Sequence, residues 1–275
     1  MWFGNLVTCE YWDNLWLNEG FARYYQYFLT GWDHMGFETR FITEQMHTAL
    51  LSDSANSPLP LTYPQLTTPA SVRANMFSVI TYSKGAAFIR MTEHLLGSSV
   101  HRQGLQAYSV ARPIDLFRTL QLAATQAQAL DAYGYRKISI CLETSGFNYF
   151  YYYINFQSRF NINIGVSNLN TLYIVPLTFT TASNPDFTNT KPTHIMSTQN
   201  LIIETPLSSN DWLYSRLMSY TKALSILSYL ENEKDYAPWV AAITGFQWLR
   251  NRLAVSPLSS YLDVSFLLIF VLSKQ

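Results

Sequence analysis

Residues 15–29 read Leu-Trp-Leu-Asn-Glu-Gly-Phe-Ala-Arg-Tyr-Tyr-Gln-Tyr-Phe-Leu. The stretch is rich in aromatic and aliphatic side chains, contains no proline, and has Gly20 as its single glycine. Glycine and proline are the residues that most often interrupt a helix. The stretch therefore predicts a helix, which carries the acidic residue Glu19 and, four positions later, the basic residue Arg23.

Outward from this helix, residues 1–133 are predicted to be mostly helical. Four prolines lie within residues 57–69, which indicates a loop or an extended crossing. A further helix is predicted around residues 88–95, because apolar side chains recur there at positions i, i+3 and i+7, a spacing that lines one face of a helix. Another helix is predicted over about Pro113 to Leu130, with an acidic residue near its start.

Residues 134–205 have a different character. The segment from Thr171 to Thr181 alternates its side chains and is enriched in β-branched and aromatic residues, which predicts a strand. Pro176 makes this an edge strand or marks a bulge, because proline cannot donate to a β-ladder. The segment from Phe147 to Phe160 is rich in Tyr, Phe and Asn and resembles a strand pair in composition.

Residues 206–275 return to a helical pattern. Pro238 is predicted to begin a helix there, because proline is tolerated in the first turn. We therefore predict a mainly α fold with a small β part (α+β). The predicted domains are residues 1–133, residues 134–205 and residues 206–275.

The composition of this 275-residue chain excludes several classes of protein. Its 48% hydrophobic residues suffice for a packed core, which excludes wholesale disorder. Lys+Arg and Asp+Glu are equal at 18 each, and this net charge of zero argues against general electrostatic binding of nucleic acid. The two cysteines, Cys9 and Cys141, cannot build a disulfide framework or a four-thiolate zinc site, although they could form one bridge.

Nothing in the chain itself predicts secretion or a membrane anchor. The first residues lack a basic segment followed by an apolar one, the pattern of a signal peptide. The longest apolar run, residues 264–272, is well short of the roughly 20 residues that a membrane-spanning helix needs.

Two residues are candidates for chemistry, and each has a simpler interpretation. Glu19 could be a metal ligand, but an acidic residue four positions before Arg23 is also an ordinary surface pair on a helix. Tyr82 could be a functional hydroxyl, but most tyrosines pack their ring and leave their hydroxyl in water. The five histidines show no H-E-x-x-H or H-x-x-x-H pairing, so each is first interpreted as a surface or core residue.

Taken together, three segments change these interpretations. Trp2 to Thr8 reads W-F-G-N-L-V-T, Trp16 to Ala22 reads W-L-N-E-G-F-A, and Tyr82 to Ala86 reads Y-S-K-G-A. They resemble successive motifs of the gluzincin zinc aminopeptidases, the aminopeptidase N family, and most closely those of insect gut enzymes. Further matching segments are Asp115 to Phe117, Leu172 to Pro192 and Tyr229 to Trp239. The resemblance therefore covers most of the chain.

The resemblance implies a zinc metallo-aminopeptidase that removes amino-terminal residues from peptides. Residues 1–133 would be the carboxy-terminal half of a thermolysin-like catalytic domain, followed by a β-sandwich remnant and the start of a helical domain. Glu19 would be the third zinc ligand, and Tyr82 the hydroxyl that stabilises the oxyanion formed from the peptide carbonyl. The implied partners are peptides, and the implied location is the extracellular face of the plasma membrane or the secreted fraction.

The sequence departs from the family pattern at its beginning. Residues 1–18 fill the whole spacing that the family places between its second histidine and the glutamate, so no H-E-x-x-H precedes Glu19 in this chain. We expect a fragment that begins just after that motif, that does not retain zinc, and that is inactive alone. Membrane association would depend on parts outside this chain. The alternative is a non-catalytic, degenerate relative that binds peptides or a partner.

Overall fold

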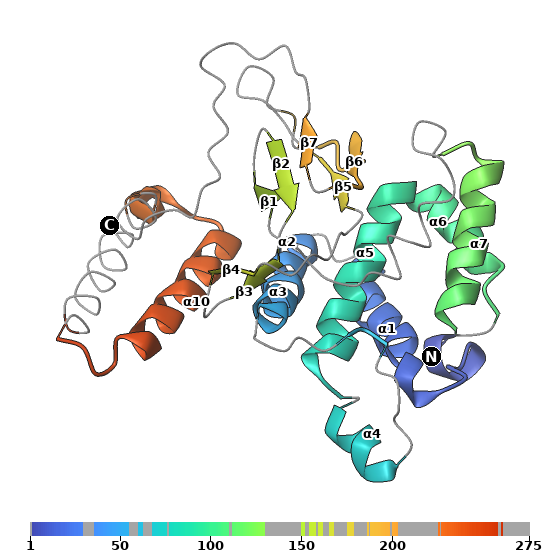
Figure 1. Cartoon of the computed structure of the whole chain (residues 1–275), viewed down its shortest axis with the longest axis horizontal. Coiled ribbons are helices and arrows are strands. Elements are labelled where there is room, and N and C mark those ends of the chain that lie inside the picture. Colours follow the sequence, from blue (N-terminus) through green and yellow to red (C-terminus); the bar gives the residue numbers. More distant parts are fainter. Residues whose placement is uncertain are drawn as a thin grey trace.

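A computed structural model describes residues 2–29, 36–54, 60–62, 68–75, 77–109, 112–129, 150–151, 154–157, 159–161, 165–167, 175–178, 186, 188–198, 200–202, 225, 227–257 and 260. Over these residues the protein is mainly helical with a small β part, so the predicted fold class is confirmed. Most of the amino-terminal helices gather on one side of the molecule and the carboxy-terminal helix lies on the opposite side, with short strands between them (Figure 1).

The amino-terminal part consists of α-helices and short 3₁₀ or π turns. In chain order they are η1 (Trp2–Leu6), η2 (Trp12–Asn14), α1 (Trp16–Phe28), α2 (Phe37–Phe41), η4 (Ile42–Met46), α3 (His47–Asp53), α4 (Pro69–Asn75), η5 (Ile80–Lys84), α5 (Gly85–Leu96), α6 (Ser98–Gln106) and α7 (Pro113–Gln126). The first of these is not a regular helix, because Phe3 and Gly4 have non-helical backbone angles, with φ of 113° at Gly4. This conformation is one that glycine adopts without steric cost.

Two of the long helices contain a π-helical turn. The elements α2, η4 and α3 follow one another without a break from Phe37 to Asp53, and η5 leads directly into α5, which ends at Leu96. A π turn holds its hydrogen bonds one residue further apart than an α-helix does, and such turns are frequent at functional sites. Tyr82 is the middle residue of η5.

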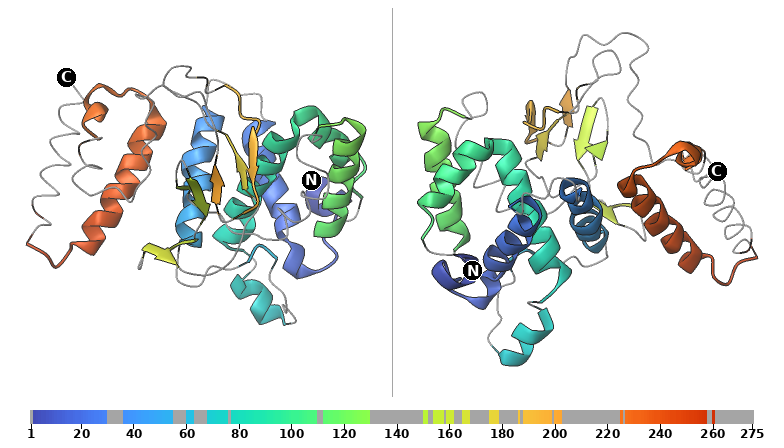
Figure 2. Two further views of the ribbon diagram at one scale, coloured as in Figure 1. Left: turned by 45° about the horizontal axis from the view of Figure 1, so that its top comes forward. Right: turned by 180° about the vertical axis from the view of Figure 1, so that it is seen from behind.

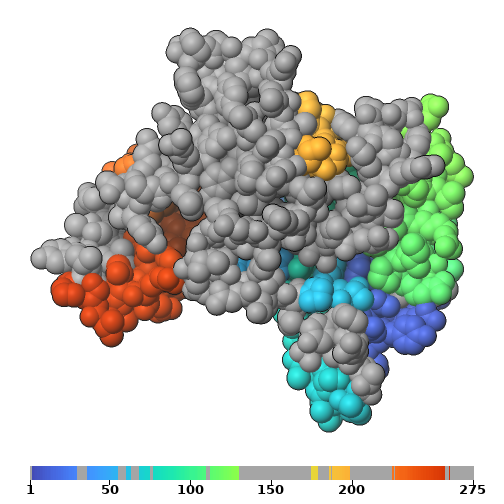
Figure 3. All heavy atoms as spheres, in the orientation of Figure 1, coloured from blue at the N-terminus to red at the C-terminus, as the bar shows by residue number. Residues whose placement is uncertain are grey.

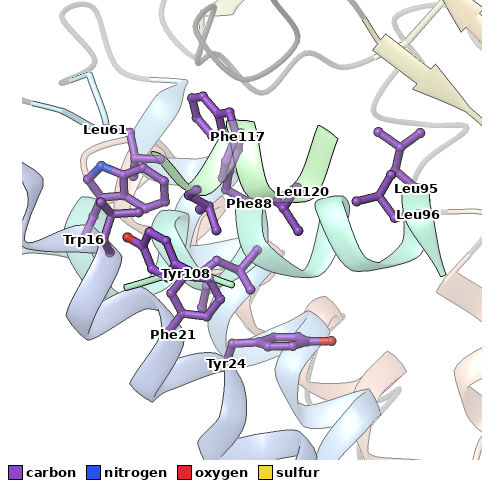
Figure 4. Close-up of a cluster of buried hydrophobic side chains, with 14 of the residues drawn as sticks. Trp16, Phe21, Tyr24, Leu61, Phe88, Leu95, Leu96, Tyr108, Phe117 and Leu120 are labelled. Carbon is purple, nitrogen blue, oxygen red and sulfur yellow. The ribbon is translucent and has the colours of Figure 1, made fainter. Parts of the chain in front are cut away.

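Helices α1, α5 and α7 supply most of the hydrophobic core. Figure 4 shows labelled side chains from these helices directed into a common cluster. The largest side chains that these three helices bury to at most 1% exposure are those of Leu17, Phe21, Ile89, Leu116 and Leu120. Because each such side chain contributes about 1.5–3 kcal/mol when it leaves water, this core fixes how the three helices pack.

The predicted helices are found close to their expected bounds. The helix predicted over residues 15–29 is α1, and the apolar stripe of residues 88–95 lies on α5, with Phe88 and Leu95 buried. The helix predicted to begin at Pro113 does so, but it ends at Gln126, and Leu130 lies outside the described residues. It covers one end of the molecule in Figure 3.

The proline-rich segment over residues 57–69 is irregular where the structure describes it. Residues 60–62 form no helix or strand, and residues 55–59 and 63–67 lie outside the description. Pro69, the last of the four prolines, instead begins α4, because the first turn of a helix needs no amide hydrogen. This helix projects from the other helices in both views of Figure 2.

The β part consists of short antiparallel strands. Three of them, β1 (Phe150–Tyr151), β2 (Ile154–Gln157) and β7 (Asn200–Ile202), form a sheet in the order β1-β2-β7. Two pairs complete the set, β3 (Arg159–Asn161) with β4 (Gly165–Ser167) and β5 (Val175–Leu177) with β6 (His194–Met196). The strand pair predicted within Phe147 to Phe160 corresponds to β1 and β2.

The predicted strand with Pro176 is also found. Pro176 lies opposite Ile195 in the register of β5 and β6, and this sheet has two strands among the described residues. Both strands are therefore edges in the described part of the chain, and an edge position accommodates a residue that has no amide hydrogen. Residues 171–174 and 179–181, the flanks of this predicted strand, lie outside the described residues.

The carboxy-terminal part contains η6 (Leu227–Asn232) and α10 (Tyr236–Arg252), which pack around Leu230 and Phe246. The prediction that Pro238 begins the last helix was wrong by two residues, because α10 begins at Tyr236. Amide hydrogens throughout the first turn have no helical partner, so proline is accepted after the first position as well.

Within the described residues no helix is both long and apolar enough to cross a membrane. The apolar run at 264–272 is not described, and the domain boundaries stay a prediction.

Candidate functional site

A close helix crossing brings the two candidate residues together. Helices α1 and α5 pack side by side, and a Cβ atom on Gly20 would lie 2.9 Å from the carbonyl carbon of Gly85. Glu19 directly precedes Gly20, and Tyr82 lies three residues before Gly85 on the η5 turn that continues into α5. Since residues three apart along a helix share a face, the glycine contact places Glu19 and Tyr82 on adjoining surfaces of the two helices.

The environment of Tyr82 keeps its hydroxyl protonated at neutral pH. Burial raises the pKa of Tyr82 first, and the nearby negative charge of Glu19 raises the pKa further. The Arg23 guanidinium opposes these effects, and its central carbon lies 5.3 Å from the centroid of the Tyr82 ring. A phenol with a raised pKa is a hydrogen-bond donor across the physiological range.

The simpler interpretation of Glu19 as half of a surface pair with Arg23 is not what the structure shows. Among the ion pairs of the described residues there is none between these two side chains. Arg23 instead donates to Gln26 Oε1 at 3.3 Å and lies over the Tyr82 ring. The half-buried carboxylate of Glu19 is therefore not paired with Arg23, and its negative charge acts on Tyr82.

The amino-terminal motif packs directly against the helix that carries Glu19. The rings of Phe3 and Phe21 are stacked, with their centroids 4.3 Å apart. The amide of Asn18 lies beside Gly4, where a Cβ atom would be 3.8 Å from Asn18 Nδ2. Asn18 is buried, and its Oδ1 atom has no hydrogen-bond partner in the described part of the chain. The W-F-G-N and W-L-N-E-G-F-A segments thus form one packed unit around the residue before Glu19.

The described residues do not by themselves complete a metal site. No group of three or more His, Cys, Asp or Glu side chains among them is arranged to hold a metal ion. A structural or catalytic zinc takes at least three protein ligands, so Glu19 alone is an incomplete donor set. His101, the most buried histidine, lies 3.2 Å from Thr92 Oγ1 and is committed to the core. His34 lies outside the described residues.

Cys9 is a half-buried free thiol in this structure, and Cys141 lies outside the described residues. Burial raises the pKa of Cys9, a backbone hydrogen bond lowers it, and the negative charges of Asp13 and Glu19 raise it further.

Sequence reasoning missed the residues that hold Tyr82 in place. Ser83 and Lys84 follow it on η5, both are buried, and both bond to side chains of other helices. One signal for Lys84 was present in the sequence, since this lysine stands in an apolar stretch with no acidic residue three or four positions away. A lysine in that setting needs a buried partner from elsewhere in the chain.

Two cavities of the structure are lined by described residues. One of about 690 Å³ lies between α2 and the first turn of α10 and is lined by Thr39, Arg40 and Tyr236, among others. A second, of about 390 Å³, lies beside the start of α7 and is lined in part by Glu10 and Arg112. Neither of these two cavities is lined by Glu19 or Tyr82.

Comparison with known proteins gives a family and several relatives. The peptidase family M1 domain matches residues 1–132. The membrane alanyl aminopeptidase of Heliothis virescens is 45% identical over 94% of this chain and 32% of its own length, and that of Manduca sexta is 37% identical over 92% and 33%. Human aminopeptidase N is 38% identical over 39% of this chain and 11% of its own length. This chain thus spans about a third of the length of the two insect relatives.

Proposed function

This chain belongs to peptidase family M1, and on that premise we propose that residues 1–132 form part of the catalytic domain of an aminopeptidase that removes amino-terminal residues from peptides. Glu19 would be a zinc ligand, and Tyr82 the hydroxyl that stabilises the developing oxyanion. The observation that carries this proposal is the placement of Glu19 beside Tyr82 across the crossing of α1 and α5. The names of the insect relatives support the same reaction class.

Tyr82 has the protonation state that this role requires. An oxyanion is stabilised by a donor already in position, and removing one such donor typically costs about 10²–10³-fold in kcat. A tyrosine hydroxyl with its ordinary pKa of about 10 is already protonated at neutral pH and can donate in a hydrogen bond, and the raised pKa of Tyr82 extends this state to higher pH. Zinc, when bound, would supply Lewis-acid polarisation of the substrate carbonyl. Among the described residues Glu19 alone does not complete a zinc site.

We further propose that this chain alone does not turn over substrate. Supporting this, the sequence holds no H-E-x-x-H, and the described residues hold no group of three metal ligands. The test is zinc analysis of the purified chain by mass spectrometry, together with hydrolysis of alanine p-nitroanilide. We expect less than stoichiometric zinc and no turnover. Stoichiometric zinc with hydrolysis, both lost in Glu19→Ala, would contradict inactivity while supporting the role of Glu19.

The role of Tyr82 is tested in a complete family enzyme. Replacing the tyrosine of its Y-x-K-G-A motif with phenylalanine should lower kcat by about 10²–10³-fold with little change in KM, because the hydroxyl acts in the transition state. A change confined to KM would contradict the proposed role. The glycine of the same motif is unsuitable as a control, since it belongs to the helix crossing.

A non-catalytic role is the alternative, in which this chain binds peptides or a partner without hydrolysis. The observation that favours it is the incomplete donor set around Glu19 in the described part of the chain. A fluorescent peptide with a free amino-terminal alanine would bind without losing that alanine. Absence of binding at high micromolar concentration would remove this alternative.

We also infer a location at the extracellular face of a membrane or in the secreted fraction. The support is the word "membrane" in the names of both insect relatives. Immunolocalisation with and without permeabilisation of the cells tests it, and staining that requires permeabilisation would contradict it.

A further inference from the structure

Tyr82 stands on a π turn whose next two residues are tied to other helices. The side chain of Ser83 donates to Gln45 Oε1 at 2.8 Å, and Lys84 Nζ lies 2.9 Å from Asp53 Oδ1. We propose that these two contacts position the Tyr82 hydroxyl against Glu19, so that Lys84, Asp53, Ser83 and Gln45 are positioning residues of the site. The functional meaning of this inference rests on the proposed role of Tyr82, but its geometry does not.

The ion pair between Lys84 and Asp53 is almost completely buried. The two side chains are 3% and 6% exposed, and Asp53 Oδ2 has no hydrogen-bond partner among the described residues. A buried ion pair is weak evidence for stability, because apolar residues of similar volume often stabilise a protein as well or better. An incompletely satisfied pair at this depth is therefore better explained by what it fixes, which is the attachment of η5 to the end of α3.

The contact between Ser83 and Gln45 continues into a hydrogen-bonded chain that returns to the helix of Glu19. Gln45 Nε2 donates to the hydroxyl of Tyr27 at 2.8 Å, and this hydroxyl donates to Glu44 Oε2 at 2.6 Å. Arg40 Nε donates to the other oxygen of Glu44 at 2.8 Å. Tyr27 lies on α1, two helical turns after Glu19. The chain thus links the turn that carries Tyr82, through η4, to the helix that carries Glu19.

The π turn η5 presents Tyr82 to the candidate site while its next two residues anchor it to other helices. The two π turns, η4 and η5, contact each other, and the bonded residues Gln45 and Ser83 lie one on each. Tyr82 is half-buried and faces Arg23 of α1, whereas Ser83 and Lys84 are buried against η4 and α3. Tyr82 therefore faces the candidate site, whereas the next two residues, Ser83 and Lys84, face the helices that anchor the turn. Rotation of the turn would move all three side chains together.

The experiment uses the full chain with 3-fluorotyrosine at position 82, observed by ¹⁹F NMR, and amide hydrogen exchange of residues 80–84. The test variant is Asp53→Leu with Lys84→Met, which replaces both charges by apolar groups. We expect the ¹⁹F resonance to shift or broaden, and exchange in η5 to accelerate by about tenfold or more relative to α7. A folded double variant with an unchanged resonance and unchanged exchange would overturn the proposal.

Two further variants separate positioning from stability. Leu120→Ala destabilises the core from α7, away from these contacts, and should leave the Tyr82 resonance where it is. If the charge-free double variant does not fold, Ser83→Ala with Gln45→Met removes the second contact without leaving a buried charge, and the same spectral change is expected. An unchanged resonance in that variant, or an equal change in Leu120→Ala, would also overturn the proposal. Because no readout uses catalysis, loss of the proposed role of Tyr82 in a family enzyme would be a separate result.

Discussion

Gly20 of α1 and Gly85 of α5 allow the two helices to touch backbone to backbone. A Cβ atom on Gly85 would lie 3.2 Å from Gly20 Cα and 3.3 Å from the carbonyl oxygen of Trp16. Because these are backbone atoms, they cannot move aside as the end of a flexible side chain would. The distance between Glu19 and Tyr82 is therefore set by the absence of two side chains.

The first prediction is that adding a methyl group at this crossing destabilises the protein. Gly20→Ala should lower the free energy of unfolding by about 1–3 kcal/mol, because overpacking a close contact outweighs the better helix propensity of alanine. The matched control is Gly245→Ala on α10, where a Cβ atom meets nothing within 4 Å. That change should be neutral or stabilise by up to about 1 kcal/mol. Urea titrations followed by circular dichroism measure both, and equal effects of the two changes would show that the crossing is not tight.

The second prediction concerns the core behind the site. Leu120 is 0% exposed and Leu122, on the same helix, is 55% exposed. Leu120→Ala should cost about 2–5 kcal/mol, the range for a leucine removed from a packed core. Leu122→Ala should change stability by no more than about 0.5 kcal/mol, as is usual for surface positions. Thermal unfolding of the pair checks this, and similar midpoints would indicate that α7 does not pack as described.

Local signals in the sequence predicted the helices well and their irregularities poorly. Residues 15–29 predict α1 to within one residue at each end, because an uninterrupted apolar stretch has few alternatives. The π turns were not predicted, because the one residue that each adds shifts the apolar spacing by a single position, and such a shift is not recognised in one sequence. The start of α10 was missed because proline at position 238 is compatible with several places in a first turn.

In the candidate site, too, the sequence identified some residues and not others. Glu19 and Tyr82 were identified from short motifs, and the two glycines that bring them together stand in those same motifs. Their support could not be identified, because the partner of Lys84 is Asp53, 31 residues earlier, and nothing local connects the two. Pairing between distant residues depends on tertiary packing, which a single sequence does not state.

The third prediction is that protonation of His101 lowers the stability of the folded protein at acid pH. Burial lowers the pKa of this histidine from its ordinary 6.5 to about 4, although the nearby carboxylate of Glu93 acts in the opposite direction. Between these values the unfolded chain binds more protons than the folded one, so stability is complete above pH 6.5 and falls as the pH drops. Between about pH 7 and pH 5 the loss should be about 2 kcal/mol.

Denaturant titrations at several pH values test this dependence. His101→Gln removes the titrating group, so its stability should vary less between those pH values than that of the unaltered chain. His47 provides a control: burial lowers its pKa too, but by less than that of His101, so His47→Gln should retain most of the original slope. If His101→Gln retains it instead, the acid sensitivity comes from other groups.

The last prediction tests the electrostatic coupling of Glu19, Arg23 and Tyr82 with two substitutions of opposite sign. The Glu19 charge raises the pKa of Tyr82 and the Arg23 charge lowers it. Glu19→Gln should therefore move the pKa of Tyr82 down toward its ordinary value of about 10, and Arg23→Gln should move it further up. NMR titration of tyrosines labelled with ¹³C at Cζ measures both, with the Tyr82 resonance assigned by its loss in Tyr82→Phe. Shifts of the same sign would mean that the substitutions act by altering the burial of the ring, since charge alone requires opposite directions.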